Sequence, residues 1–120
     1  MGIFNHMVEH ASLDRVFHAL ADPTRRTMLR TLAGRTRTVG ELAEPFDMSF
    51  AAAAKHVKVL EEAGLLSREV RGRQHFCRLA PAPLAAADEW LAFYQRYWSA
   101  RLDDLEAALS RHARIKRRKR

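Results

Sequence analysis

The chain has 120 residues, and its 21 Lys and Arg residues outnumber 14 Asp and Glu residues, which gives a net charge of +7. This length fits one domain, and the single cysteine, Cys77, excludes both an internal disulfide and a four-cysteine zinc site. No stretch approaches the roughly 18 apolar residues of a membrane span. We therefore expect a reduced, cytoplasmic protein. The excess of basic residues favours a polyanionic partner, nucleic acid first and an anionic membrane second, and of these we expect nucleic acid and no membrane partner.

No repeat or linker divides the chain, so residues 12–110 are predicted to form one domain between an N-terminal extension (1–11) and a basic tail (111–120). The opening "MGIFNHM" fits either a native start or a cloning remnant that precedes a natural start at Met7. The tail contains seven Lys and Arg residues and no acidic residue. We expect it to be disordered, and a disordered basic tail can still bind phosphate backbones.

Two helices are predicted before the centre of the chain. The first covers about residues 12–21, where apolar side chains follow the helical spacing i, i+3, i+4, i+7. These side chains are Leu13, Val16, Phe17 and Leu20. Asp22 is a natural N-cap for the second helix, Pro23 suits its first position, and Gly34 ends it after Ala33.

The stretch "TVGELAEPFDMSFAAAAKHVKVLEEAGLL" predicts two further helices joined by a tight turn. The first spans about residues 39–44, and Pro45 should break it. The second begins after a cap at Ser49 and runs to about Ala63, where Gly64 stops it. Two short helices joined in this way form a helix-turn-helix unit.

The second of these helices begins with four consecutive alanines, residues 51–54. With Ala53 at the centre of the buried face and about 100° per residue, Val57 and Leu60 complete the inner stripe. The other three alanines then lie outside the core. Alanine is the best helix former, so this run is either filler or a surface kept bare for a large partner.

A bare helix start followed by two outward lysines suits the major groove of DNA, which is about 12 Å wide. Short side chains allow deep insertion, and alanine methyl groups can contact thymine methyl groups. A serine hydroxyl and the first N–H groups can hold a phosphate, whereas Glu62 should mark where the helix leaves the groove. The residues of this helix expected to contact DNA are Ser49, Ala51, Ala52, Ala54, Lys55 and Lys58.

After Gly64 the sequence predicts a β-hairpin from the segments "LLSREV" and "QHFCRL". Gly72 supplies the turn between them, and Arg71 and Arg73 make the tip basic. Because Phe76 and Cys77 are adjacent, the alternation is imperfect and the register of the two strands stays open.

The last helix is predicted over about residues 83–111. Its apolar stripe runs from Leu84 to Leu109, which is too long for one small core to bury, so we interpret it as a subunit interface. An ordinary intramolecular core is the alternative.

With these residues in place, the chain resembles the ArsR/SmtB family of winged helix-turn-helix repressors. The matching pieces are "VFHALADPTRRTMLRTLAG", "TVGELAEPFDMSFAAAAKHVKVLEEAGLLSREVRGRQHFCRL" and the closing helix, and the most specific string is "KHVKVLEEAGL". The resemblance implies a mostly α fold with a small β-hairpin, dimerised through the first and last helices, and repression by occluding a promoter at a palindromic operator. Its interface would include Val16, Phe17, Leu20, Leu91, Tyr94, Trp98, Leu102 and Leu105. The resemblance also implies that the wing tip, with Arg71 and Arg73, contacts the flanking DNA backbone or minor groove.

The chain departs from the metal-sensing pattern of that family. The best-known sensors carry two cysteines in a Glu-Leu-Cys-x-Cys string, and here Ala43 and Pro45 stand at those positions. A second known site on the last helix would need histidine or acidic partners that Asp103 and His112 lack. We therefore expect no metal and no cofactor, and the effector is unknown. Ala54 also replaces a serine common in the recognition helix of the family.

Isolated residues with possible chemistry have simpler structural interpretations. We predict that His56 packs and bonds to nearby backbone, and that Cys77 is a small core residue, with a redox switch as the alternative. His6 and His10 have zinc-compatible spacing but only one nearby carboxylate.

No combination of nucleophile and general base is evident, so we expect no enzyme. Two alternatives to a plain repressor stay open. One is an effector-gated sensor with a small ligand near Trp90–Trp98, and the other is a winged-helix module that binds protein or RNA.

Overall fold

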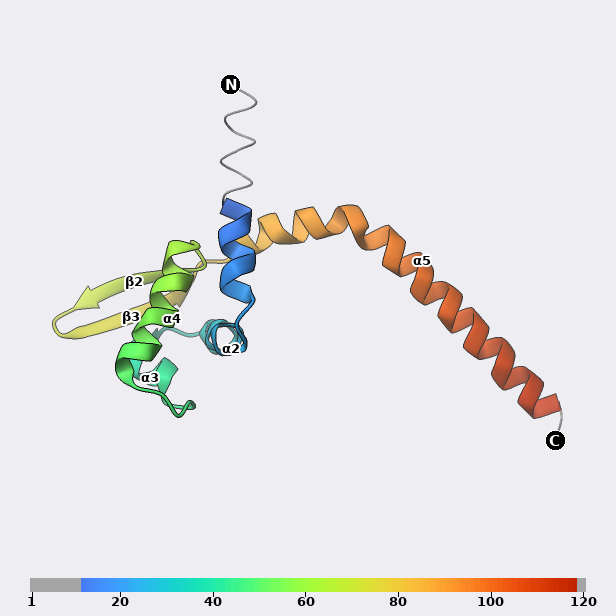
Figure 1. The fold of residues 1–120 in the computed structure, drawn as a ribbon, viewed down its shortest axis with the longest axis horizontal. Coiled ribbons are helices and arrows are strands. Elements are labelled where there is room, and N and C mark those ends of the chain that lie inside the picture. Colours follow the sequence, from blue (N-terminus) through green and yellow to red (C-terminus); the bar gives the residue numbers. More distant parts are fainter. Residues whose placement is uncertain (1–11, 119–120) are drawn as a thin grey trace, which may run out of the picture. The chain divides into compact units, whose positions relative to one another are not determined.

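The structure, a computed structural model, describes residues 12–118 of the chain (Figure 1). Its helices cover residues 12–20, α2 (Pro23–Leu32), α3 (Val39–Ala43), α4 (Phe50–Glu62) and α5 (Ala82–Arg118). Its strands are β1 (Arg37–Thr38), β2 (Leu66–Arg71) and β3 (Gln74–Leu79), in the order β1-β3-β2 within one antiparallel sheet. The chain divides into two units: the first ends at Ala87, and the second is the rest of α5. The mostly helical architecture with a small sheet is as predicted.

Side chains fix where the helices of the first unit begin. The carboxylate of Asp22 accepts hydrogen bonds from the backbone N–H of Thr24 at 2.7 Å and of Arg25 at 3.2 Å, which caps α2 as predicted. The Oγ atom of Ser49 accepts from the N–H of Ala52 at 3.1 Å and caps α4, also as predicted. These caps satisfy N–H groups that no helical carbonyl can reach.

The start of α3 has a capping box that was not predicted from the sequence. Thr38 and Glu41 form a reciprocal capping box, in which each side chain accepts from the backbone N–H of the other residue. The hydrogen bond from the Thr38 N–H is the largest cause of a lowered pKa at Glu41. The first helix of the helix-turn-helix unit therefore begins at a defined residue although it has only five residues.

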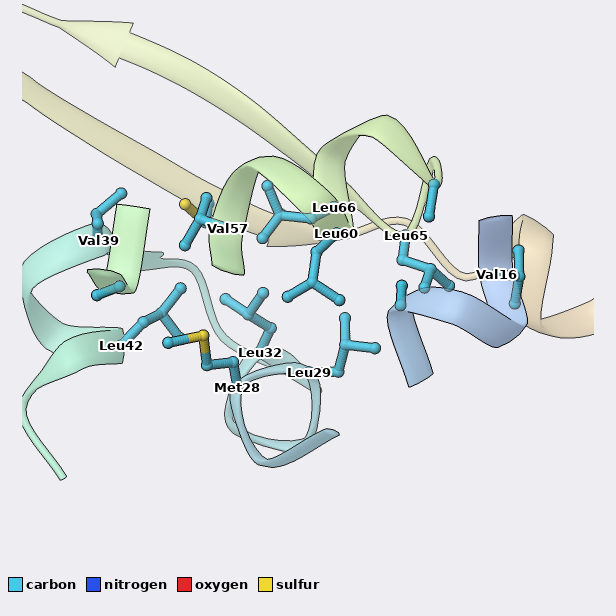
Figure 2. Close-up of a cluster of buried hydrophobic side chains, with 14 of the residues drawn as sticks. Val16, Met28, Leu29, Leu32, Val39, Leu42, Val57, Leu60, Leu65 and Leu66 are labelled. Carbon is cyan, nitrogen blue, oxygen red and sulfur yellow. The ribbon is translucent and has the colours of Figure 1, made fainter. Parts of the chain in front are cut away.

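One apolar core joins the elements of the first unit (Figure 2). Side chains from α2, α3 and α4 gather in it, and its fully buried members include Met28, Leu32, Leu42, Val57, Leu60 and Leu65. Val16, on the helix at 12–20, belongs to this core with 1% of its surface exposed. Its assignment to a subunit interface was therefore wrong, because no surface of this side chain is left for a partner.

The sheet has a third strand that the sequence analysis did not predict. β1 pairs with β3 through Arg37 opposite Cys77 and Thr38 opposite Phe76. A strand of two residues has no alternation to detect, so its pairing depends on the tertiary fold. Cys77 is fully buried in this central strand, and burial raises the pKa of its thiol. It is a core residue, as predicted, and not an activated thiolate.

The pairing of β2 with β3 resolves the register that the sequence left open. The ladder runs from Leu66 opposite Leu79 to Arg71 opposite Gln74. The turn therefore consists of Gly72 and Arg73 alone, and Gly72 has φ 63°, a conformation that glycine adopts at little cost. β2 and β3 form the long hairpin labelled in Figure 1, which is the wing of the fold.

α5 is longer than predicted and extends to Arg118. The prediction of a disordered tail is thus wrong for residues 111–118. Arg, Lys and Ala are strong helix formers, no Gly or Pro follows Pro83, and cations near a helix C-terminus interact favourably with its dipole. None of the helices within residues 12–118 is long and apolar enough to cross a membrane.

Candidate nucleic-acid interface

The four alanines of α4 occupy the positions that helical periodicity predicts. Ala53 is completely buried, Ala51 is exposed, and Ala52 and Ala54 are half-buried at the flanks. Lys55 and Lys58 are exposed on the same side as Ala51. The outer face of the first two turns therefore presents small side chains to solvent.

The two outward lysines differ in their surroundings. The Nζ atom of Lys58 lies 4.0 Å from Oε1 of Glu62, and both side chains are mostly exposed. Lys55 makes no ion pair within the part of the chain that the structure describes. An exposed pair contributes only about 0–1 kcal/mol, so Lys58 can exchange its carboxylate partner for a phosphate at little cost.

The N-terminus of α4 has hydrogen-bond donors that could bind an anion, and beside them lies an exposed aromatic residue. Ser49 uses its oxygen as an acceptor for the cap, which leaves its O–H free to act as a donor. Phe50, the first helical residue, is 63% exposed and was missed by the sequence analysis. Helical periodicity gave no signal for this exposure, because Phe50 lies about 20° from Val57 and so continues the stripe formed by Ala53, Val57 and Leu60.

At the tip of the wing, Arg71 forms an ion pair within the described residues and Arg73 does not. Nη2 of Arg71 lies 3.0 Å from Oε2 of Glu69, and its guanidinium lies 5.1 Å from the centroid of the Phe76 ring. The hydrogen bond from Arg71 is the largest cause of a lowered pKa at Glu69. Arg73, in the turn, is exposed and makes no ion pair to any residue between 12 and 118. Val70, beside the tip, is also exposed and was not predicted.

A cluster of three side chains links the wing to α4. On β2, Arg68 places Nη2 3.3 Å from Oε1 of Glu61 and Nε 3.3 Å from Oε2 of the same carboxylate. Its Nη1 atom lies 3.5 Å from Nδ1 of His75 on β3. The guanidinium is mostly shielded, so this interaction is screened less than a surface pair. It fixes the wing relative to the last turn of α4.

A second link ties α4 to the elements before it. Nδ1 of His56 lies 3.2 Å from Nη1 of Arg25. The prediction that His56 bonds to nearby backbone was therefore wrong, because its hydrogen-bond partner is a side chain of α2. Arg25 also donates from Nε to the carbonyl of Ala19 at 2.8 Å and from Nη2 to that of His18 at 3.0 Å. Its Nη1 atom lies 3.7 Å from Oδ2 of Asp22.

The environment of Asp22 alters the acidity of its carboxyl group. Burial alone would raise its pKa, but the hydrogen bonds from Arg25 and Thr24 and the charge of Arg25 act against burial and lower it overall. The deprotonated form of the cap is therefore favoured in the folded chain.

Considered by itself, the second unit exposes a long apolar stripe. Ring contacts connect Tyr94, on the stripe, to aromatic residues beside it: the centroids of Trp90 and Tyr94 are 5.0 Å apart, and those of Phe93 and Tyr94 are 4.9 Å apart. The exposed apolar side chains of this unit are Trp90, Leu91, Phe93, Tyr94, Tyr97, Trp98, Leu102, Leu105, Leu109 and Ile115. An exposed apolar surface of this length is typical of an interface.

The residues assigned to the first-helix part of the dimer interface differ in exposure. Phe17 is 36% exposed, whereas Leu20 is partly buried against the core of its own unit. Phe17 therefore keeps the larger surface for a partner.

The described residues do not provide the ligands of the two metal sites known from the family that the chain resembles. Ala43 and Pro45 lack ligand atoms, and within residues 12–118 no three His, Cys, Asp or Glu side chains come together to hold a metal ion. His6 and His10, whose spacing suits zinc, lie outside the described residues.

The chain is similar to known regulators over most of its length. A helix-turn-helix domain family matches residues 20–69. The HTH-type transcriptional regulator Rv2034 of Mycobacterium tuberculosis is 38% identical over 96 residues, which cover 80% of this chain and 87% of that protein. The transcriptional repressor SdpR of Bacillus subtilis is 32% identical over 79 residues, which cover 66% of this chain and 88% of SdpR.

Solved structures match the fold as well. The crystal structure of an ArsR family transcriptional regulator has a TM-score of 0.70 at 40% identity, over 74% of this chain and 92% of the other. The homodimeric winged helix-turn-helix domain Mb0332 of Mycobacterium bovis, a possible ArsR-family regulator, has a TM-score of 0.57 at 28% identity, over 70% and 81% of the two chains.

Proposed function

Because this chain belongs to the ArsR family of winged helix-turn-helix transcriptional regulators, we propose that it is a homodimeric repressor that occludes a promoter at a palindromic operator. The family makes it a transcriptional regulator with a helix-turn-helix DNA-binding domain, and not an enzyme. The observation that carries the proposal is the outer face of α4, where Ala51 and the flanking alanines leave the helix surface bare beside two exposed lysines.

In this proposal α4 enters the major groove with its first turns. Ala51, Ala52 and Ala54 lie against the base edges, where their methyl groups can contact thymine methyl groups. Lys55 donates to guanine or to phosphate, and Lys58 leaves Glu62 for a phosphate. Ser49 and the N–H groups of the first turn hold a backbone phosphate. The carboxylate of Glu62 repels the duplex and sets the depth of insertion.

The wing supplies backbone contacts beside the groove. Arg73 reaches phosphate directly, since no carboxylate within the described residues holds it. Arg71 must release Glu69 or bind a phosphate alongside it, so its contribution is smaller. The ion pair of Arg68 with Glu61 keeps the distance between wing and α4 constant, which fixes the spacing of the two DNA-binding elements.

A second copy of the chain is the partner proposed for the apolar stripe of α5. The homodimeric state of the M. bovis domain supports this partner. A twofold axis between two copies makes the bound DNA palindromic, because each α4 then reads an equivalent half-site. The proposed interface residues are Phe17, Leu20, Leu91, Tyr94, Trp98, Leu102 and Leu105.

The direction of regulation is proposed from a relative. SdpR, 32% identical to this chain, is a transcriptional repressor by name. A protein that covers promoter DNA represses by excluding polymerase, which needs no further catalytic or activating surface.

Selection of bound duplexes from a random pool tests this function. We expect the enriched sequences to contain two symmetric half-sites with centres about 10 base pairs, or a multiple of this, apart. Transcription from a promoter that contains the selected site should fall when the protein is added. Equal enrichment of unrelated duplexes, or preference for RNA, would contradict the proposal and favour an interaction module.

A further inference from the structure

The net positive charge of this protein resides entirely in its last ten residues. Residues 111–120 contain seven of the 21 Lys and Arg residues and no Asp or Glu. The 14 basic side chains of residues 1–110 are balanced by all 14 acidic side chains. Within residues 1–110, the first unit has 12 basic and 9 acidic side chains, and the part of α5 from residue 88 to 110 has two basic and five acidic side chains. The last ten residues, with seven basic side chains, therefore carry the largest net positive charge of any part of the chain and are the strongest source of long-range attraction to a polyanion.

The described part of this tail is the final turns of α5, whose side chains are exposed through Arg117. The apolar stripe ends at Leu109. At about 100° per residue, the positions that would continue it are His112 and Lys116. Ile115 is apolar and exposed, but it lies about 100° from Trp98, so it does not continue the stripe. The terminal turns are therefore not a continuation of that interface.

The basic side chains lie mainly away from the stripe. With Trp98 at the centre of the stripe, Arg111 and Arg114 fall about 140° and 160° from it, on the opposite face, and Arg117 about 100° from it. This face stays open to solvent when the stripe is covered. Earlier in the same unit the corresponding face is mixed in charge, because Arg96 is accompanied by Glu89 and Asp103.

We propose that the terminal turns of α5, residues 110–118, are a second DNA-binding surface that contacts phosphates without reading sequence. Its partner is the duplex on either side of the operator, and it adds electrostatic attraction to that of the less strongly charged first unit. The inference rests on the proposed DNA-binding function and adds to it a surface outside the helix-turn-helix unit. A basic surface attracts a polyanion, and the polyanion that this protein already binds in the proposed complex is DNA.

The double variant Arg111→Gln with Arg114→Gln tests this surface. Gln is nearly as good a helix former as Arg, so α5 should persist. The matched control is Arg96→Gln with Arg101→Gln, which removes the same charge from the same helix. Affinity is measured from about 0.05 to 0.3 M salt, for a duplex selected by the parental protein and for a mixed-sequence duplex of equal length.

We expect the affinity of the terminal variant for both duplexes to fall by about tenfold or more at 0.1 M salt. The slope of log affinity against log salt should be reduced by roughly 0.9 for each phosphate that the variant no longer neutralises. The ratio of the two affinities should stay unchanged. The control should keep nearly the parental slope. Circular dichroism and sedimentation of both variants establish that helix content and oligomeric state are retained.

An unchanged slope in the terminal variant, or the same weakening in both variants, would overturn the inference. Vesicles containing anionic lipid form a parallel arm: weaker vesicle binding with an unchanged DNA slope would assign the surface to membranes and reject DNA. Failure of the parental protein to prefer any duplex would instead overturn the proposed function, so the two failures are distinguishable.

Discussion

Nδ1 of His56 lies 3.2 Å from Nη1 of Arg25, and this hydrogen bond joins the middle of α4 to the first turn of α2. His56 is half-buried on the flank of α4, between the buried stripe and the outer face. Because Nη1 is a donor, Nδ1 must accept, which assigns the N–H of the neutral ring to Nε2. The position of the proposed recognition helix therefore depends on a side chain 31 residues earlier in the chain.

Arg25→Ala should destabilise the domain by roughly 1–3 kcal/mol. The substitution removes partly buried hydrogen bonds to the carbonyl of Ala19 and to His56, and an exposed one to the carbonyl of His18, so two partly shielded acceptors lose their donor. Arg25→Lys should recover little of this, because an ammonium group cannot serve three acceptors in the planar geometry of a guanidinium. Urea unfolding monitored by circular dichroism gives the free energies. A double-mutant cycle with His56→Ala isolates their shared contribution, and a zero coupling energy would mean that the hydrogen bond between them does not stabilise the fold.

Stability should fall as the pH is lowered through the range in which Asp22 titrates. The folded chain lowers the pKa of Asp22, so its carboxylate stabilises the fold above the ordinary pKa of about 4, and this contribution disappears as the pH falls through the lower folded value. Asp22→Asn keeps a capping oxygen but does not titrate. The difference in unfolding free energy between parent and variant should therefore shrink between pH 7 and pH 3. A difference independent of pH would show that the charge of Asp22 has no part in the cap.

The local parts of this fold could be predicted from the sequence, and its long-range interactions could not. The caps at Asp22 and Ser49 and the burial of Ala53 follow from residue type and helical period, which involve only a few neighbouring residues. Strand β1 has two residues and exists because β3 lies beside it. The ion pair between Glu61 and Arg68 depends on the angle at which the chain leaves α4, which no local pattern specifies.

The candidate site shows the same division. Periodicity predicted the outward positions of Ala51, Lys55 and Lys58, and it missed the exposure of Phe50 because the helical period places this residue about 20° from Val57, on the inner stripe. Val16 was assigned to the interface by resemblance, although its own helix stripe also fits a core residue. The helical state of residues 111–118 was missed because charge was given more weight than the helix propensity of Arg, Lys and Ala.

Trp98→Glu should convert a dimer into monomer or aggregate. The change places a charge in the proposed interface, and an unpaired buried charge costs several kcal/mol. Phe93→Glu is the matched control, since Phe93 is exposed on the same helix about 140° from Trp98. Sedimentation velocity at several concentrations compares the two variants. If the Trp98→Glu protein sediments as a folded dimer, as the control does, the apolar stripe does not form the dimer interface.

Ala51→Glu should abolish operator binding while leaving the fold intact. Ala51 is exposed and Glu is a good helix former, so the melting temperature should change little. In the proposed complex the longer, negatively charged side chain meets the groove floor, and affinity should fall to the non-specific level, a decrease of about 4 kcal/mol or more. Ala51→Gln separates length from charge, because it keeps the length and lacks the repulsion. Melting temperature and operator affinity are measured at one salt concentration for parent and both variants. If Ala51→Glu binds operator as tightly as the parent, the alanine run stays out of the groove and is present only because alanine favours a helix.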